Sequence, residues 1–187
     1  MNKLPLLLAT GLLAACQATS FEQAPLQALS CDSALAGDWS SLDEEGKADG
    51  EVVLHVGKDC TLEVTERKPA GPQTGEATRF HLGRHGGHTY AWVDANWLMR
   101  RFDEEHRMPE GDVYVMRYRV QGDQLELWST EDKPIAHAII DDELEGEVIA
   151  RDERLFNRLT GTQDPEVLDR AGFFDADPGR FQRVRSD

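Results

Sequence analysis

The chain has 187 residues, of which 40% are hydrophobic, and this length suits one domain with a buried core. It carries 35 acidic against 20 basic residues, a formal net charge of −15. This balance argues against nucleic acid as a partner, because phosphates need clustered lysine and arginine, and against a domain that lies flat on an anionic membrane. It is compatible with a basic protein partner, a cationic ligand or solubility alone.

Residues 1–16 predict export. Lys3 is the only charged side chain ahead of an apolar run at residues 4–13, which is too short for a bilayer core that needs about 20 helical residues. A positive start, a short apolar run and small residues before a cleavage site are typical of a secretory signal. The motif LAAC, which ends at Cys16, resembles the lipobox of bacterial lipoproteins. The resemblance implies that residues 1–15 are a signal peptide and that Cys16 is acylated.

The same resemblance implies a location. In that family an Asp directly after the acylated cysteine tends to retain the protein at the inner membrane, so Gln17 implies the outer membrane, with the domain expected in the periplasm. Acyl chains anchor a protein stably without a transmembrane helix. Residues 16–30 show neither strand alternation nor a sustained helical face, and we expect them to be the acylated Cys and a flexible tether. Residues 31–187 are then a single β-rich globular domain.

Two further cysteines, Cys31 and Cys60, form an even pair in an exported chain, which predicts a disulfide. The bridge closes a loop of about 30 residues, which is worth roughly 3–4 kcal/mol in the chain-entropy model. The spacing matches no CxxC redox pattern, so we interpret the bridge as structural.

The domain shows mostly period-two hydrophobicity, which is typical of half-buried strands. Val52, Leu54 and Val56 alternate before a predicted turn at residues 57–59, and residues 60–64 alternate after it. Further runs of this kind follow at residues 80–82, 90–92, 112–120, 125–128, 146–150 and 180–185.

Two helical segments interrupt this pattern. The first follows Ser129 and Thr130, which can cap a helix, and it places Ile135 and Ile139 on one face. The second begins at Thr162 with an Asp-Pro-Glu start signature and ends near Gly172.

Many short strands and few helices predict a mainly β fold, an antiparallel barrel or sandwich with one or two short helices. The motif Gly37-Asp38-Trp39 resembles the Gly-x-Trp opening motif of lipocalin-like barrels. This resemblance implies that Trp39 closes one end of the barrel and packs against a basic residue near the C-terminus, with Arg183, Arg185 and Arg180 as candidates. The chain departs from that family because it lacks a convincing Thr-Asp-Tyr turn and because its two helical segments come earlier and more often than the single late lipocalin helix.

Aromatic residues are candidates for a ligand cavity inside the barrel. The residues that we expect to line it are Trp39, Trp92, Trp128, Tyr114 and Tyr118. The alternative is that they simply fill the core. Strand alternation places Arg117 and Arg119 on the face opposite Tyr114, which argues against cationic groups inside the cavity.

Three histidines lie within eight residues at His81, His85 and His88, with glycines between them that allow the chain to turn back. They are candidate ligands for Zn²⁺ or Cu²⁺, and His106 is a candidate fourth ligand. The alternative is a polar hairpin that happens to carry histidines, since no HExxH pattern supports the metal.

The sequence holds no GxSxG motif, phosphate-binding glycine loop or dinucleotide fingerprint, so it does not support an enzyme. Our first hypothesis is a lipoprotein anchored to the outer membrane that acts as a non-catalytic module for a small apolar ligand or a protein. The alternative is an immunity-type inhibitor whose acidic surface blocks a basic periplasmic or cell-wall enzyme. The third is a metal-binding protein built on the histidine cluster.

Overall fold

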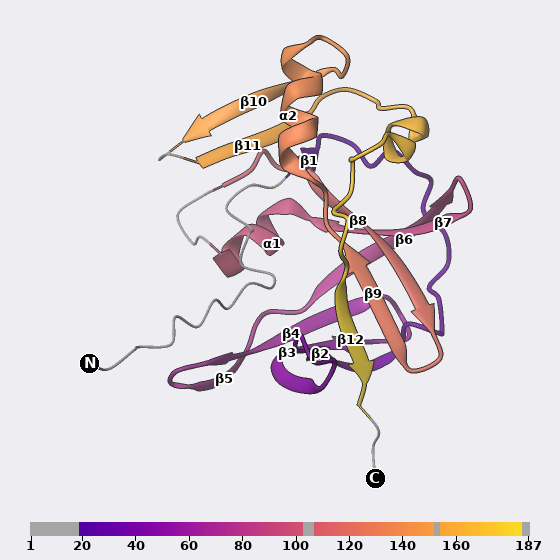
Figure 1. Ribbon diagram of the computed structural model, residues 1–187, viewed down its shortest axis with the longest axis vertical. Coiled ribbons are helices and arrows are strands. Elements are labelled where there is room, and N and C mark those ends of the chain that lie inside the picture. Colours follow the sequence, from indigo (N-terminus) through magenta and orange to yellow (C-terminus); the bar gives the residue numbers. More distant parts are fainter. Residues whose placement is uncertain (1–18, 103–106, 152–153, 185–187) are drawn as a thin grey trace.

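The computed structural model describes residues 19–102, 107–151 and 154–184. Within them, eight antiparallel strands close into a barrel (Figure 1). In order around the barrel they are β2 (Gly37–Leu42), β3 (Ala48–Val56), β4 (Thr61–Lys68), β6 (Thr78–His85), β7 (His88–Asp94), β8 (Val113–Gln121), β9 (Gln124–Trp128) and β12 (Gly179–Arg183). The barrel is closed because β12 pairs with both β9 and β2. The predicted mainly β fold is confirmed, and of the two predicted architectures, barrel and sandwich, it is the barrel.

Strand alternation builds two apolar layers, one on each side of the barrel wall. On β8, Tyr114 and Tyr118 point inward and join an inner cluster that also contains Trp39. The intervening Val115 points outward and joins an outer cluster with Tyr90. The wall therefore has an apolar outer face as well as an apolar interior, and the helices after β9 cover that outer face.

Trp39 and Arg183 close one end of the barrel. The indole is fully buried, its Nε1 donates to the Leu35 carbonyl at 2.8 Å, and the Arg183 guanidinium lies 4.1 Å above its ring. The same guanidinium donates to the carbonyls of Ala34 and Ala36, at 2.7 and 2.5 Å. Arg183 is thus the basic partner implied by the Gly-x-Trp motif.

Helix α1 (Ala95–Phe102) follows β7 at the opposite end of the barrel and was not predicted from the sequence. Its first turn is capped by Asp94, whose Oδ1 accepts from the Trp97 backbone N–H at 2.7 Å. Trp97 and Met99 are buried in the inner cluster. The helix therefore packs onto the end of the barrel that Trp39 does not close.

Helix α2 (Asp132–Ile140) confirms the first predicted helix, and Ile135 and Ile139 are buried as expected. The second predicted helix is a single 3₁₀ turn, η1 (Pro165–Asp169), which Asp164 caps. At the top of Figure 1, α2 packs against the hairpin of β10 (Gly146–Arg151) and β11 (Arg154–Leu159). A short strand, β5 (Gly71–Thr74), pairs with β4.

The chain from Thr19 onward is not the flexible tether that the sequence indicated. Strand β1 (Thr19–Phe21) lies between β8 and β11, and all three of its residues have zero exposed fraction. Leu29 then bridges to Leu82 on β6. The folded part of the chain therefore begins no later than Thr19, because β1 is paired on both edges.

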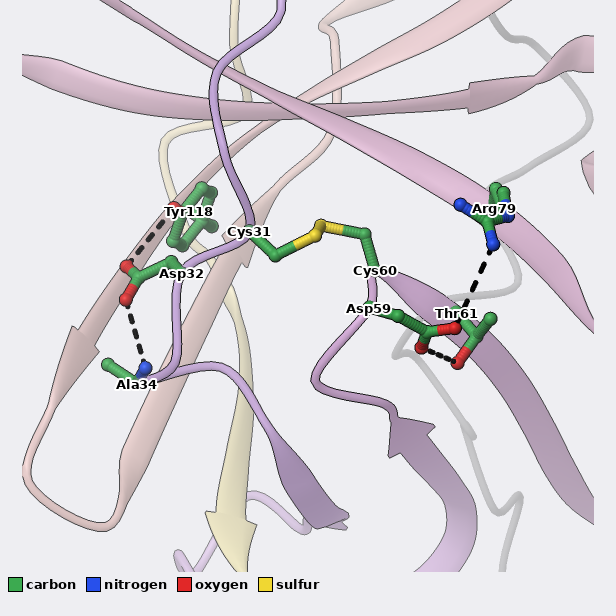
Figure 2. Close-up of a disulfide and its surroundings, with 8 residues drawn as sticks. All are labelled: Cys31, Asp32, Ala34, Asp59, Cys60, Thr61, Arg79 and Tyr118. Atoms are coloured by element: carbon green, nitrogen blue, oxygen red, sulfur yellow. Dashed lines mark hydrogen bonds and ion pairs between the residues drawn. A yellow bond between two sulfur atoms is a disulfide. The ribbon is translucent and has the colours of Figure 1, made fainter.

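The predicted disulfide joins Cys31 to Cys60, with the two Cα atoms 5.6 Å apart (Figure 2). Cys60 is the last residue of the turn between β3 and β4. Cys31 lies just ahead of the segment whose carbonyls accept hydrogen bonds from Arg183. Asp32 beside the bridge accepts hydrogen bonds from the Ala34 backbone N–H and the Tyr118 hydroxyl. The bridge thus fastens the chain ahead of β2 to the barrel end.

Candidate functional site

The barrel wall separates the five aromatic residues that were predicted to line one ligand cavity. Trp39, Tyr114 and Tyr118 belong to the inner cluster. Trp92 belongs to the outer cluster, and Trp128 packs against it. The structure therefore does not bring the five side chains together, and their role in ligand binding stays a prediction.

The inward-facing residues are packed as a core. Trp39, Leu125 and Phe181 each expose 1% or less of their surface. Burial raises the pKa of Tyr118 to about 12 and also raises the pKa of Tyr114. Both phenols therefore remain protonated at neutral pH, and they serve as packing groups rather than as acids or bases.

A groove of about 210 Å³ lies on the barrel wall where the β6–β7 turn meets β8 and β9. It is lined by Gly87, His88, Thr89, Arg117, Tyr118, Arg119 and Trp128. Three of these residues, His88, Tyr118 and Trp128, were candidates from the sequence. The groove brings them together at a place that the sequence did not indicate.

Arg117 is the distinctive charge in this groove. Its guanidinium carbon lies 4.6 Å from the centre of the Trp128 ring and 5.3 Å from that of Phe174. Within the described part of the chain, the side chain of Arg117 has no hydrogen bond or ion pair. Arg119 differs, because its Nε donates to Glu126 Oε2 at 2.7 Å. One of the two arginines is therefore neutralised by a carboxylate, and the other is held only by aromatic rings.

Sheet register explains how Arg117 reaches this position. Tyr90 on β7, Arg117 on β8 and Trp128 on β9 are opposite one another across three adjacent strands. Arg117 faces outward, as alternation predicted. Burial raises the pKa of Tyr90, the negative charge of Asp169 raises it further, and the positive charge of Arg117 lowers it. The sequence carried no signal for Phe174, which comes from the segment after η1.

The three histidines do not converge. His81 stacks on Trp92 with ring centres 5.7 Å apart, while His85 pairs across the hairpin with His88. His85 Nε2 lies 3.1 Å from Asp169 Oδ2. Among residues 19–102, 107–151 and 154–184, no group of three or more His, Cys, Asp or Glu side chains is arranged to hold a metal ion. The candidate fourth ligand, His106, lies outside the described residues.

A second groove, of about 270 Å³, lies between α2 and the chain that follows η1. Its sides include Ile135 and Phe173, and an ion pair between Arg170 and Glu143 spans it. Because its cation already has an acidic partner, this groove offers a ligand less unsatisfied charge than the groove at Arg117.

The fold and the groove together define a closed antiparallel β-barrel with a surface recess rather than an open internal cup. Comparison with models of protein families, with curated proteins and with solved structures finds no match to this chain. No helix among the described residues is both long enough and apolar enough to cross a membrane.

Proposed function

We propose that the chain is a lipoprotein of the outer membrane whose barrel is a non-catalytic binding module, and that the groove around Arg117 receives a carboxylate or phosphate group of the bound molecule. The lipobox-like motif at Cys16 supports the anchor. The groove supports the binding role, because the interior of the barrel is occupied by its own side chains.

The observation that carries the proposal is the state of Arg117. The chain has 35 acidic and 20 basic residues, yet this half-buried arginine lacks a carboxylate partner. Its positive charge is therefore available to bind an anion. Stacking on Trp128 and Phe174 fixes the plane of the guanidinium and leaves its N–H edge for two parallel hydrogen bonds. A guanidinium that is already held in place loses less side-chain entropy when it binds an anion than a freely rotating one.

The scaffold supports a further part of the proposal, a distant relation to lipocalin-like barrels. The Gly37-Asp38-Trp39 motif, the barrel strands and the stacking of Arg183 on Trp39 favour it. In this chain the barrel would serve as a rigid frame, and the ligand would lie on its wall rather than inside it.

The test is a titration of the chain from Gln17 onward with benzoate and phenyl phosphate, followed by tryptophan fluorescence and calorimetry. We expect saturable binding that Arg117→Ala weakens by about tenfold or more, which is ~1.4 kcal/mol. Arg180→Ala is the matched control, because Arg180 is exposed and lies outside the groove, so its loss should leave the affinity within about twofold. Equal affinity in the wild type and in Arg117→Ala, or no saturable binding, contradicts the proposed site.

The acidic turn after α2 favours the second candidate, an inhibitor of a basic enzyme. Asp141, Asp142 and Glu145 are exposed there. Such a partner would associate quickly at low salt and weakly at high salt. Pull-down of basic periplasmic proteins at two ionic strengths distinguishes the candidates. The inhibitor is favoured if a basic protein is captured by the wild type and by Arg117→Ala, but not by the double variant Asp141→Asn with Asp142→Asn.

A further inference from the structure

Strand β1 is an internal part of the sheet, although it lies close to the start of the chain. It pairs in parallel with β11 and antiparallel with β8. In the strand order of the described sheet, the β10–β11 hairpin reaches the barrel only through β1. Removing β1 would therefore remove the strand pairing between that hairpin and the barrel wall.

Buried hydrogen bonds fasten β1 to both neighbours. Ser20 Oγ donates to Asp112 Oδ2 at 3.2 Å, and Arg158 on β11 holds both oxygens of the same carboxylate, at 2.8 and 3.0 Å. Thr19 Oγ1 donates to Asp132 Oδ1 at 2.9 Å. A strand that is paired on both edges, and whose Ser20 bonds to a carboxylate that Arg158 holds in place, does not act as a loose linker.

The position of Thr19 limits how far the domain can stand from an acylated Cys16. The two residues are three positions apart in the sequence. Even a fully extended chain spans at most about 3.6 Å per residue, so their Cα atoms are no more than about 11 Å apart. A Cys16 whose acyl chains are buried in lipid brings the N-terminal end of β1 to the level of the headgroups.

We propose that the domain is held flush against the bilayer by β1, with the start of α2, which adjoins the buried start of β1, turned towards the headgroups. This rests on the acylation of Cys16 in the proposed function. Thr19 bonds directly to Asp132, the first residue of α2, so the neighbouring exposed Lys133 marks the lipid-proximal face.

The experiment uses the full-length acylated protein in phosphatidylethanolamine vesicles whose headgroups carry a quencher. A fluorophore is attached at Lys133→Cys. The native chain offers no competing thiol, because Cys16 is acylated and Cys31 is bonded to Cys60. We expect quenching at position 133 to be at least about twofold stronger in this protein than in the variant with a lengthened linker, because an added reach of about 20 Å lets the domain move away from the headgroups.

The matched control inserts 15 Gly/Ser residues between Ala18 and Thr19, which leaves β1 intact and adds a reach of about 20 Å. Quenching at position 133 should then fall by at least about twofold. No effect of the insertion overturns the flush arrangement. A protein that does not co-sediment with vesicles at all overturns the acyl anchor instead, so the two failures are distinguishable.

Discussion

Asp132 is a carboxyl in a poorly hydrated position at the start of α2. Burial raises its pKa to about 7, the hydrogen bond from Thr19 lowers it, and the charges of Asp175 and Glu131 raise it. Burial and its interaction with Glu131 also raise the pKa of Asp175, to about 6. The folded state therefore holds protons here that the unfolded chain has released.

This gives a definite sign for the pH dependence of stability. The ordinary pKa of an aspartate carboxyl is 3.8, so the folded state binds more protons than the unfolded state between about pH 4 and pH 7. The contribution of Asp132 is fully present below about pH 4 and is lost as the pH rises through about 7.

We expect Asp132→Asn to remove this loss, because the amide keeps an acceptor for Thr19 but cannot ionise. The melting temperature of the variant should exceed that of the wild type at pH 8, and the difference should shrink or reverse near pH 4.5. Thermal denaturation at both pH values measures it. Asp141→Asn is the control, because it removes the same charge from an exposed position at the other end of the same helix. A pH-independent difference for Asp132→Asn contradicts the assignment.

At the scale of elements, the disulfide and the Trp39–Arg183 pair act on the same segment. Both hold residues 31–36 against one end of the barrel, the bridge from one side and the guanidinium from the other. The two restraints meet on one short segment, so their contributions are not expected to be additive.

Cys31→Ser with Cys60→Ser should destabilise the domain by roughly 3 kcal/mol, because the bridge closes a loop of about 30 residues in the unfolded chain. Urea denaturation measures this change. Combining the pair with Arg183→Gln tests the coupling: a non-additive loss indicates a shared segment, whereas strict additivity would falsify the idea that both restrain residues 31–36. Arg180→Gln is the matched control, because Arg180 is exposed and does not contact Trp39.

Elements with a local signal were predictable from sequence, and elements that depend on distant partners were not. Alternation predicted β3, β4, β8 and β9, and two isoleucines four residues apart predicted α2. Strand β1 was missed because three residues show no periodicity and their partner β11 lies more than 130 residues away. Helix α1 was missed because its buried residues alternate as in a strand, while the capping bond from Asp94 makes it helical.

The candidate site was predictable in part for the same reason. Alternation correctly placed Arg117 on the outer face, but that result argued against a role when the ligand was expected inside the barrel. The position of the Arg117 guanidinium depends on Phe174, which lies more than 50 residues further along the chain, and no local pattern encodes that contact. The glycines before His88 did indicate a turn, but no local pattern showed that this turn meets β8 and β9.

At the scale of the whole molecule, the structure is a barrel with an attached outer layer, and β1 connects the two. The outer layer consists of α2, β10 and β11, and its pairing to the barrel runs through β1. A chain that starts at Cys31, the boundary that the sequence suggested, keeps every barrel strand but lacks that connection.

We therefore expect the chain from Cys31 onward to retain a folded barrel with a loosened outer layer. Amide hydrogen exchange should show protection lost in α2 and β10–β11 and largely retained in β2–β4, because local opening follows the loss of packed and paired neighbours. The chain from Gln17 onward is the reference. A chain with Ser20→Ala and Thr19→Val keeps β1 but loses its side-chain bonds to Asp112 and Asp132, and should show an intermediate effect. Equal protection of α2 in the two truncations would mean that the outer layer holds to the barrel through its apolar contacts alone, with β1 contributing nothing to their attachment.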